Sequence, residues 1–366
     1  YLALSAVPVE YRSKIAQKAF LELERKFGTL SKEEPKSVEF KEVMTPIPDK
    51  ATKKMNLTQW LGAFKKYDDN TSWNGQKGNV SKGGVIELSR SFGKTVQETP
   101  DYFYDFVLNL YKENVSLNYV SEAINGFIGA GYDYQKIKDL ILKYSKYKDN
   151  DLQKSIISAI EALNKIEPID SEFFNVLADY ALNDPDPCKE LYRDKTPSGN
   201  YNYGGDAVDY GINTIRGSAA LAITHHGFRT GDSESVFKVL EKIAKDTFVS
   251  VRSCMIPDLA GMLNWDRKRT FSIYKKALDN MDTELLAHSG RFLGYALDKN
   301  NFVEIIPYLK RMALIDKHDA NKSAGRLAMI AVLEGCHESE TLLNELLSTS
   351  SGFRVGVAGI CMHNIT

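Results

Sequence analysis

The tripeptide Gly93-Lys94-Thr95 is the first stretch whose residue types suggest chemistry, because it matches the end of a phosphate-binding loop. That loop also needs a glycine five residues before Gly93, where this chain has Leu88. The loop must follow a β-strand so that its amide groups converge on the phosphate, whereas residues 85–92 have the apolar spacing of a helix. We therefore expect no nucleotide site at this position.

The histidines and serines form no recognisable catalytic or metal-binding pattern. His225 and His226 are adjacent, so they point in different directions on a helix and lack the i, i+4 spacing that chelates zinc. His337 lies beside Glu338 and Glu340, but no His-Glu-x-x-His and no Gly-x-Ser-x-Gly motif occurs in the sequence. We expect no catalytic residue, no metal site and no cofactor in this chain.

Five arginines recur every 28 to 39 residues in the second half of the chain, each within a run of small and apolar residues: Arg216, Arg252, Arg291, Arg326 and Arg354. If all five lined one groove, they could bind a nucleic-acid backbone. If each paired with an acid of a neighbouring repeat, they would be structural. Asp209, Asp246 and Asp319 each precede one of these arginines by six or seven residues, which favours the structural interpretation.

The elements that would position these side chains are helices. Apolar residues at three- and four-residue spacing predict helices at 9–27 and 57–67, and then through about a hundred residues from Val85. No segment alternates at period two over the length of a strand, and the connections are short. A recurrence near 35 residues is typical of stacked helical pairs. The predicted fold is all-α, a right-handed α-solenoid of HEAT-like antiparallel helix pairs.

We divide the chain into four segments. Residues 1–84 are predicted to be an N-terminal helical segment with long connectors, including a proline-marked connector at 32–54 and a loop at 68–84 around Trp73. Residues 85–183 and 211–366 are predicted to be helical repeats, and the second group opens with a small-residue helix at 211–223. Because the chain ends on an apolar run rather than a polar cap, we expect a fragment whose repeats continue past Thr366.

The remaining segment, residues 184–210, is predicted to be a long loop. Loops above about 12 to 15 residues without secondary structure are uncommon in compact arrays, and they are usually functional or disordered. This loop is rich in tyrosine, and disordered tracts are poor in aromatic residues. Tyrosine supplies a large contact area at a small entropic cost. We therefore predict that the four tyrosines of this loop contact a partner: Tyr192, Tyr201, Tyr203 and Tyr210.

Composition and charge indicate which classes of partner, and which cellular compartment, are to be expected. Forty-seven basic and 48 acidic side chains leave a formal net charge of −1, so no global field attracts nucleic acid or an anionic membrane. The four cysteines are far apart, which favours reduced thiols in a cytoplasmic protein. No apolar run approaches the roughly 18 to 20 residues of a membrane helix, and no signal peptide is recognisable. We expect no membrane partner.

The order of three features resembles the C-terminal helical-repeat region of large bacterial STAND-type P-loop NTPases, many of which act in antiphage defence. The features are Asp184-Pro185-Asp186-Pro187 before a polar loop, then Gly211-Ile212-Asn213-Thr214-Ile215-Arg216-Gly217-Ser218-Ala219-Ala220, and then Val251-Arg252 one repeat later. The resemblance covers mainly residues 170–335. It implies an effector and a nucleotide-binding module upstream of Tyr1, with this region as the ligand-sensing and autoinhibitory arm.

We therefore expect a non-enzymatic sensor and scaffold that binds a protein ligand, such as a phage product, and thereby allows an attached NTPase to oligomerise. A nucleic-acid-binding helical-repeat protein and a general protein–protein scaffold are the alternatives. A hydrolase built from scattered carboxylates would need a cleft that contains at least one strongly perturbed acid.

Overall fold

The computed structural model describes residue 4 and residues 7–28, 43–71, 83–230, 232–279 and 282–363. Residues 32–42 of the predicted connector at 32–54, and residues 72–82 of the loop around Trp73, lie outside these ranges. Contacts divide the chain into one unit at Tyr1–Val43 and another at Met44–Thr366, so the boundary falls inside the segment that we expected at 1–84. Residues 44–71 belong to the second unit because α3 packs against α5.

The described part of the first unit includes a short 3-10 helix, η1 (Val9–Tyr11), and the α-helix α2 (Lys14–Phe27). The α-helix starts later than the predicted residue 9, because the Ser13 side chain caps it by accepting the Ala16 N–H at 3.2 Å. No residue of α2 is buried.

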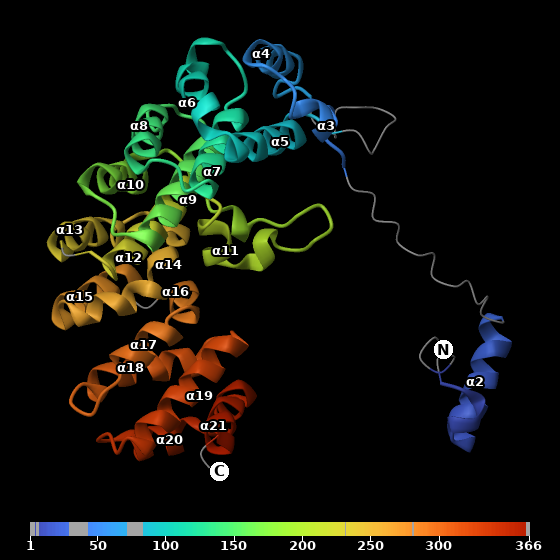
Figure 1. Ribbon diagram of the computed structural model, residues 1–366. Coiled ribbons are helices and arrows are strands. Elements are labelled where there is room, and N and C mark those ends of the chain that lie inside the picture. The colour runs from blue at the N-terminus through green and yellow to red at the C-terminus, as the bar shows by residue number, and fades with distance from the viewer. Residues whose placement is uncertain are drawn as a thin grey trace. The chain divides into compact units, whose positions relative to one another are not determined.

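The second unit is built from helices, so the all-α prediction is confirmed for the described residues; a lone β-bridge joins Lys195 and Tyr201. Up to residue 183 its helices are α3 (Asp49–Thr52), α4 (Leu57–Lys66), α5 (Val85–Glu98), α6 (Pro100–Asn109), η3 (Leu110–Lys112), α7 (Asn118–Gly129), α8 (Tyr134–Tyr144), α9 (Asn150–Ile166) and α10 (Ser171–Asn183). They follow one another in chain order in Figure 1.

The later helices continue this order. They are η4 (Leu191–Arg193), η5 (Asn202–Gly205), α11 (Ala207–Gly211), α12 (Ile215–Gly227), α13 (Ser233–Ile243), α14 (Val249–Met255), η6 (Asp258–Asn264), α15 (Arg267–Leu278), α16 (Thr283–Ala287), α17 (Gly290–Ala296), α18 (Phe302–Leu314), α19 (His318–Leu333), α20 (Ser339–Leu346) and α21 (Ser351–His363). No helix among the described residues is long and apolar enough to cross a membrane.

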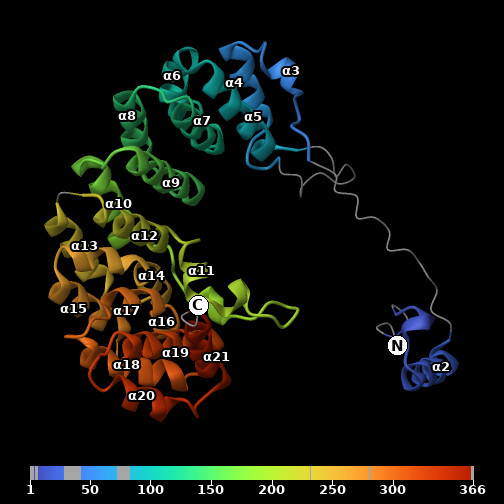
Figure 2. The same ribbon diagram turned by 60° about the horizontal axis from the view of Figure 1, so that its bottom comes forward.

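Helices that are not adjacent in sequence pack side by side in two series. In one, α5, α7, α9 and α12 each contact the next, and α12 contacts α14 and η6; η6 then contacts α17, which is followed by α19 and α21. In the other, α8 contacts α10, α10 contacts α13, and α13 contacts α15. The two series alternate along the chain, and Figure 2 shows them as neighbouring rows.

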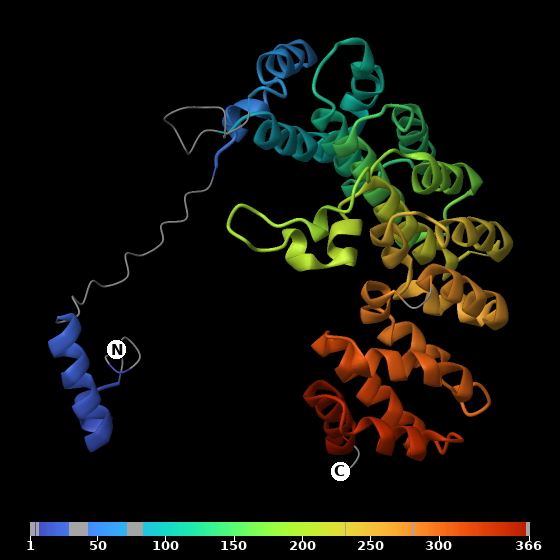
Figure 3. The same ribbon diagram turned by 180° about the vertical axis from the view of Figure 1, so that it is seen from behind.

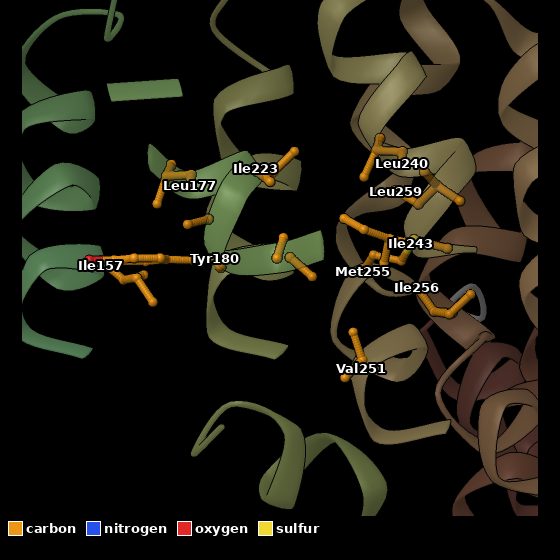
Figure 4. Close-up of a cluster of buried hydrophobic side chains, with 14 of the residues drawn as sticks. Ile157, Leu177, Tyr180, Ile223, Leu240, Ile243, Val251, Met255, Ile256 and Leu259 are labelled. Carbon is orange, nitrogen blue, oxygen red and sulfur yellow. The ribbon is translucent and has the colours of Figure 1, made fainter. Parts of the chain in front are cut away.

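A continuous apolar core fills the space between the two series, from Trp60 in α4 to Phe353 in α21. Its middle is shown in Figure 4, where Leu177 of α10, Ile223 of α12 and Leu240 of α13 belong to one cluster of buried side chains. The core follows from the helical spacing of apolar residues, because each helix buries one stripe against its neighbours.

The helix predicted at 211–223 begins later than expected. Helix α11 ends at Gly211, three residues intervene, and α12 starts at Ile215. Thr214 explains the start, since its side chain accepts the N–H of Gly217 at 3.1 Å and satisfies a free donor of the first turn.

Candidate functional site

The segment from Asp184 to Tyr210, predicted to be a loop, is folded and is held at its base by two aspartates. The buried Asp184 carboxylate accepts a hydrogen bond from Gln153 Nε2 at 2.7 Å and one from the backbone N–H of Asp186 at 3.0 Å. Asp186 Oδ2 in turn accepts the N–H of Ile215 at 2.9 Å. The two aspartates therefore connect the start of the segment to α9 and to the first turn of α12.

The chain then turns back on itself. The backbone N–H of Thr196 donates to Asn200 O at 2.7 Å and closes a turn, and the N–H of Asn202 donates to Asp194 O at 3.0 Å. η4 lies before this turn, η5 and α11 lie after it, and the segment projects from the neighbouring helices in Figures 1 and 3. Backbone pairing and short helices thus give it a defined fold.

The four tyrosines of the segment divide into a buried pair and an exposed pair. Tyr192 and Tyr210 are 2% and 4% exposed, their ring centroids are 6.1 Å apart, and burial raises the pKa of each to about 12. Tyr201 and Tyr203 are 51% and 44% exposed. The first pair forms a small core for the segment, and only the second pair is available to a partner.

Neighbouring side chains of the same segment contact the two exposed rings. The Tyr203 ring lies 5.2 Å from the ring of the buried Tyr210, and Lys195 Nζ lies 5.0 Å from the ring centroid of Tyr201. The Tyr210 hydroxyl donates to Lys189 O at 2.8 Å. The supporting contacts restrict the rings before any partner arrives, which reduces the entropy lost on binding.

The segment also packs on the helices that follow it. Gly211 lies so close to Ser250 and Cys254 of α14 that a Cβ atom there would overlap both residues. Glu190 Oε1 accepts the N–H of Ser250 at 3.2 Å, and Asp206 lies 3.3 Å from His288 Nε2. The segment that carries the exposed tyrosines is therefore held by a hydrogen bond to α14 and by an ion pair to the end of α16.

Of the first two of these arginines, Arg252 is buried and Arg216 is nearly buried, and both have acidic partners. Arg216 Nη2 lies 3.5 Å from Asp246, its guanidinium lies 4.9 Å from the Phe248 ring, and both charged side chains are at most 15% exposed. Arg252 has a side chain 9% exposed and lies 3.8 Å from Asp279. Neither arginine is placed to contact a phosphate backbone.

The last three repeat arginines are exposed. Arg291 Nη1 lies 2.5 Å from Asp258, and Arg354 donates to Leu347 O at 3.2 Å. Arg326 makes no ion pair within the described ranges. The predicted acid Asp319 also has no ion pair there, whereas Asp246 pairs with Arg216. The five arginines thus occupy two different environments.

His225 lies between two carboxylates that the sequence analysis did not connect with it. Its Nδ1 is 2.8 Å from Glu161 of α9, and its Nε2 is 3.1 Å from Asp258 of η6. The hydrogen bond to Asp258, followed by that to Glu161, raises the pKa of His225 to about 9, and the same contact lowers the pKa of Asp258. With Arg291, these residues form an alternating row of acidic and basic groups across four elements.

The second histidine of the pair has a different environment. His226 is buried against Phe174, with ring centroids 5.6 Å apart, and its Nδ1 lies 3.3 Å from Asn164 Oδ1. Burial lowers its pKa. In the part of the chain that the structure describes, no three His, Cys, Asp or Glu side chains are grouped so as to hold a metal ion.

The Gly93-Lys94-Thr95 tripeptide lies inside helix α5 and not at the end of a strand. A Cβ atom on Gly93 would lie 2.6 Å from the backbone oxygen of Glu122 in α7, so this glycine allows two helices to approach closely. The amide groups of the tripeptide belong to the helix and do not converge on an anion.

A pocket of about 440 Å³ lies between α17 and α19 beside the exposed Arg291 and Arg326. Its other lining residues are Gly290, Gly294, Tyr295, Ser323, Leu327 and Ile330. The two arginines were predicted from the sequence but the pocket was not, because Tyr295 and Ser323 lie on different helices and match no local motif.

No family model matches this chain, and neither a curated protein nor a solved structure matches it.

Proposed function

We propose that this chain is a non-catalytic protein-interaction scaffold that binds a protein partner through residues 184–210. In this proposal the two series of helices form a right-handed α-solenoid of HEAT-like pairs, and the solenoid carries the segment. The observation behind the proposal is the arrangement of the four tyrosines, since two are buried as a support and two are exposed above them.

Protein-binding sites characteristically combine exposed aromatic rings with a rigid support. Tyr201 and Tyr203 are about half exposed, and the segment that carries them is joined to α9, α12 and α14. A partner would therefore bury aromatic area without having to order a long loop. Binding at the tip of the segment would also affect the start of α12, because Asp186 is hydrogen-bonded to the N–H of Ile215 there.

We further propose that the chain is the sensor arm of a bacterial STAND-type P-loop NTPase in antiphage defence, with a phage protein as the ligand and the cytoplasm as the compartment. The resemblance rests on Asp184-Pro185-Asp186-Pro187 and the stretch that starts at Gly211. Of these residues, Asp184 and Asp186 hold the base of the projecting segment. Nucleotide chemistry and oligomerisation would reside in other parts of the parent protein.

Nucleic-acid binding is the second candidate, favoured by the exposed Arg291, Arg326 and Arg354. The burial of Arg216 and Arg252 counts against it, because a backbone-tracking groove needs accessible cations in successive repeats. A salt-sensitive mobility shift with DNA or RNA, abolished by charge reversal at Arg326 and Arg354, would favour this alternative.

The proposed function is tested by affinity capture with residues 1–366 as bait. Nuclease-treated lysates of phage-infected and uninfected bacteria are compared by mass spectrometry, and an enriched protein is then purified and titrated directly against the bait. Three baits are used: the unchanged chain, the double variant Tyr201→Ala with Tyr203→Ala, and Tyr102→Ala. Tyr102 is the matched control, because it is 52% exposed but lies on α6.

A phage protein that binds the unchanged chain and the Tyr102 variant, but binds the double variant at least about tenfold more weakly, supports the proposal. If all three baits bind it equally, the segment is not the binding site. Recovery of host proteins alone would favour a general protein–protein scaffold, and nuclease-sensitive recovery would favour the nucleic-acid candidate.

A further inference from the structure

The pocket between α17 and α19 combines features that neither helix has alone. Arg326 and Ser323 on α19 face the glycine side of α17, where Gly290 and Gly294 leave room between the helices. A Cβ atom at Gly290 would lie 2.9 Å from Ser323, whereas one at Gly294 would make an ordinary 3.4 Å contact with Leu327. The helices are therefore close at Gly290 and open toward Gly294.

The charge at this pocket is unbalanced. Arg291 and His225 face the carboxylates of Asp258 and Glu161, so these four groups compensate one another. Arg326 adds a guanidinium that has no ion pair among the described residues, and it also lines a neighbouring pocket of about 520 Å³ together with Lys322. An anion placed between Arg291 and Arg326 would meet a net positive field.

The rest of the pocket is apolar and aromatic. Leu327 and Ile330 line one side, and Tyr295, which is 67% exposed, lines the other. Beyond Gly294 the surface continues to Asp298, which is ion-paired with Arg267, and to Lys299 and Glu334, so it adds no positive charge equal to that of Arg326. The uncompensated cation of the pocket is Arg326, so an anionic group would lie there and an uncharged ring toward Tyr295 and Ile330.

We propose that the pocket between α17 and α19 binds a small phosphate ester that carries an aromatic ring, such as a nucleotide. Arg326 and Arg291 hold the phosphate, the Ser323 hydroxyl donates to it, and the ring stacks on Tyr295 over Leu327. A volume of about 440 Å³ is within the range of small-ligand sites, and exposed guanidinium groups bind phosphate through paired N–H donors. This site is separate from the projecting segment and does not depend on the proposed partner.

The test is calorimetric titration of residues 1–366 at low ionic strength with AMP, ATP, adenosine and inorganic tripolyphosphate. We expect AMP and ATP to bind with a Kd below about 1 mM, adenosine to bind at least about tenfold more weakly than AMP, and tripolyphosphate to bind at least about tenfold more weakly than ATP. The last two differences measure the phosphate and the ring contributions separately.

Three variants locate the site. Arg326→Ala should weaken ATP binding by about tenfold or more, because it removes a charge-assisted hydrogen bond. Gly294→Leu should abolish binding by filling the pocket without changing its charge. Arg311→Ala, which removes an exposed arginine of α18 outside the pocket, should leave binding unchanged.

Circular dichroism of each variant confirms that it is folded before it is compared. The proposal is overturned if neither nucleotide binds below about 1 mM, or if Arg311→Ala weakens binding as much as Arg326→Ala. It is also overturned if tripolyphosphate binds as tightly as ATP, because the aromatic half of the pocket would then contribute nothing.

Discussion

Asp186 Oδ2 accepts the backbone N–H of Ile215 at 2.9 Å and so joins two residues that are 29 positions apart in the sequence, on either side of the projecting segment. The N–H of Arg216 donates to the backbone oxygen of the same aspartate at 3.0 Å. Asp186 therefore contacts the first turn of α12 from outside the helix, and it also fixes where the projecting segment begins.

The first prediction concerns this contact. Asp186→Ala removes a carboxylate that satisfies a free N–H at the start of α12, which should cost about 1 kcal/mol. The base of the segment should then open about five times more often, and limited proteolysis within residues 189–206 should accelerate by a similar factor. Asp194→Ala is the control, because Asp194 lies in the same segment and its ion pair with Lys189, at 3.9 Å, is exposed. Equal proteolysis rates for the two variants would contradict the proposed role of Asp186.

The second prediction concerns Arg216. Its guanidinium is nearly buried, pairs with Asp246 and lies over Phe248, so Arg216→Ala leaves a nearly buried carboxylate without its cationic partner. We expect the free energy of unfolding in urea to fall by about 3 kcal/mol. Arg354→Ala should change it by less than about 0.5 kcal/mol, because Arg354 is exposed and makes one hydrogen bond. Similar losses in the two variants would show that the repeat arginines share one role.

The third prediction concerns the close approach of α5 and α7. Gly93→Ala would place a methyl group 2.6 Å from the backbone oxygen of Glu122, so the helices must separate, and stability should fall by about 1–3 kcal/mol. Gly62→Ala is the control, since nothing lies within 4 Å of the added carbon in α4. That variant should gain up to about 1 kcal/mol, because alanine is the better helix former. Thermal unfolding of both variants checks whether Gly93→Ala lowers the stability and Gly62→Ala raises it.

The fourth prediction concerns how the stability contributed by His225 changes with pH. The pKa of His225 is about 9 in the folded chain, above its ordinary value of about 6.5. The protonated histidine therefore stabilises the fold fully below about pH 6.5, and this contribution is lost as pH rises through about 9. Because the side chain is 40% exposed and its charges are screened, the contribution should not exceed about 1 kcal/mol.

The measurement is the difference in unfolding free energy between the unchanged chain and His225→Gln, followed from pH 6 to pH 10. The difference should shrink as the pH rises. His337→Gln is the control, since His337 is 82% exposed and its replacement should change the unfolding free energy by less than about 0.5 kcal/mol. A difference that grows with pH would mean that the neutral histidine is the form that stabilises the fold.

The sequence predicted the helices of the second unit because most of them bury an apolar stripe, and that stripe is visible as a three- and four-residue spacing; the same spacing predicted α2, of which no residue is buried. The sequence also predicted that acids would pair with the arginines, but it identified only some of the pairs. Arg216 contacts Asp246, one of the three acids that the sequence singled out. Asp258 and Asp279 have no distinctive spacing, so their arginines could not be assigned.

The fold of residues 184–210 was not predictable, because its contacts connect residues far apart in sequence. Composition showed four tyrosines, but only the tertiary structure separates Tyr192 and Tyr210, which are buried, from Tyr201 and Tyr203. The same limit applies to His225, whose two acids lie 64 and 33 residues away. No local sequence pattern indicates such long-range contacts.

The most direct test of the proposed function is amide hydrogen exchange on residues 1–366, alone and saturated with the captured protein. The proposal predicts slower exchange within residues 194–206, around Tyr201 and Tyr203, and a smaller effect that extends to the first turn of α12 through Asp186. Unchanged exchange in residues 184–210, together with protection on α6, α8 or α18, would contradict it, because the partner would then bind the helices without touching the segment.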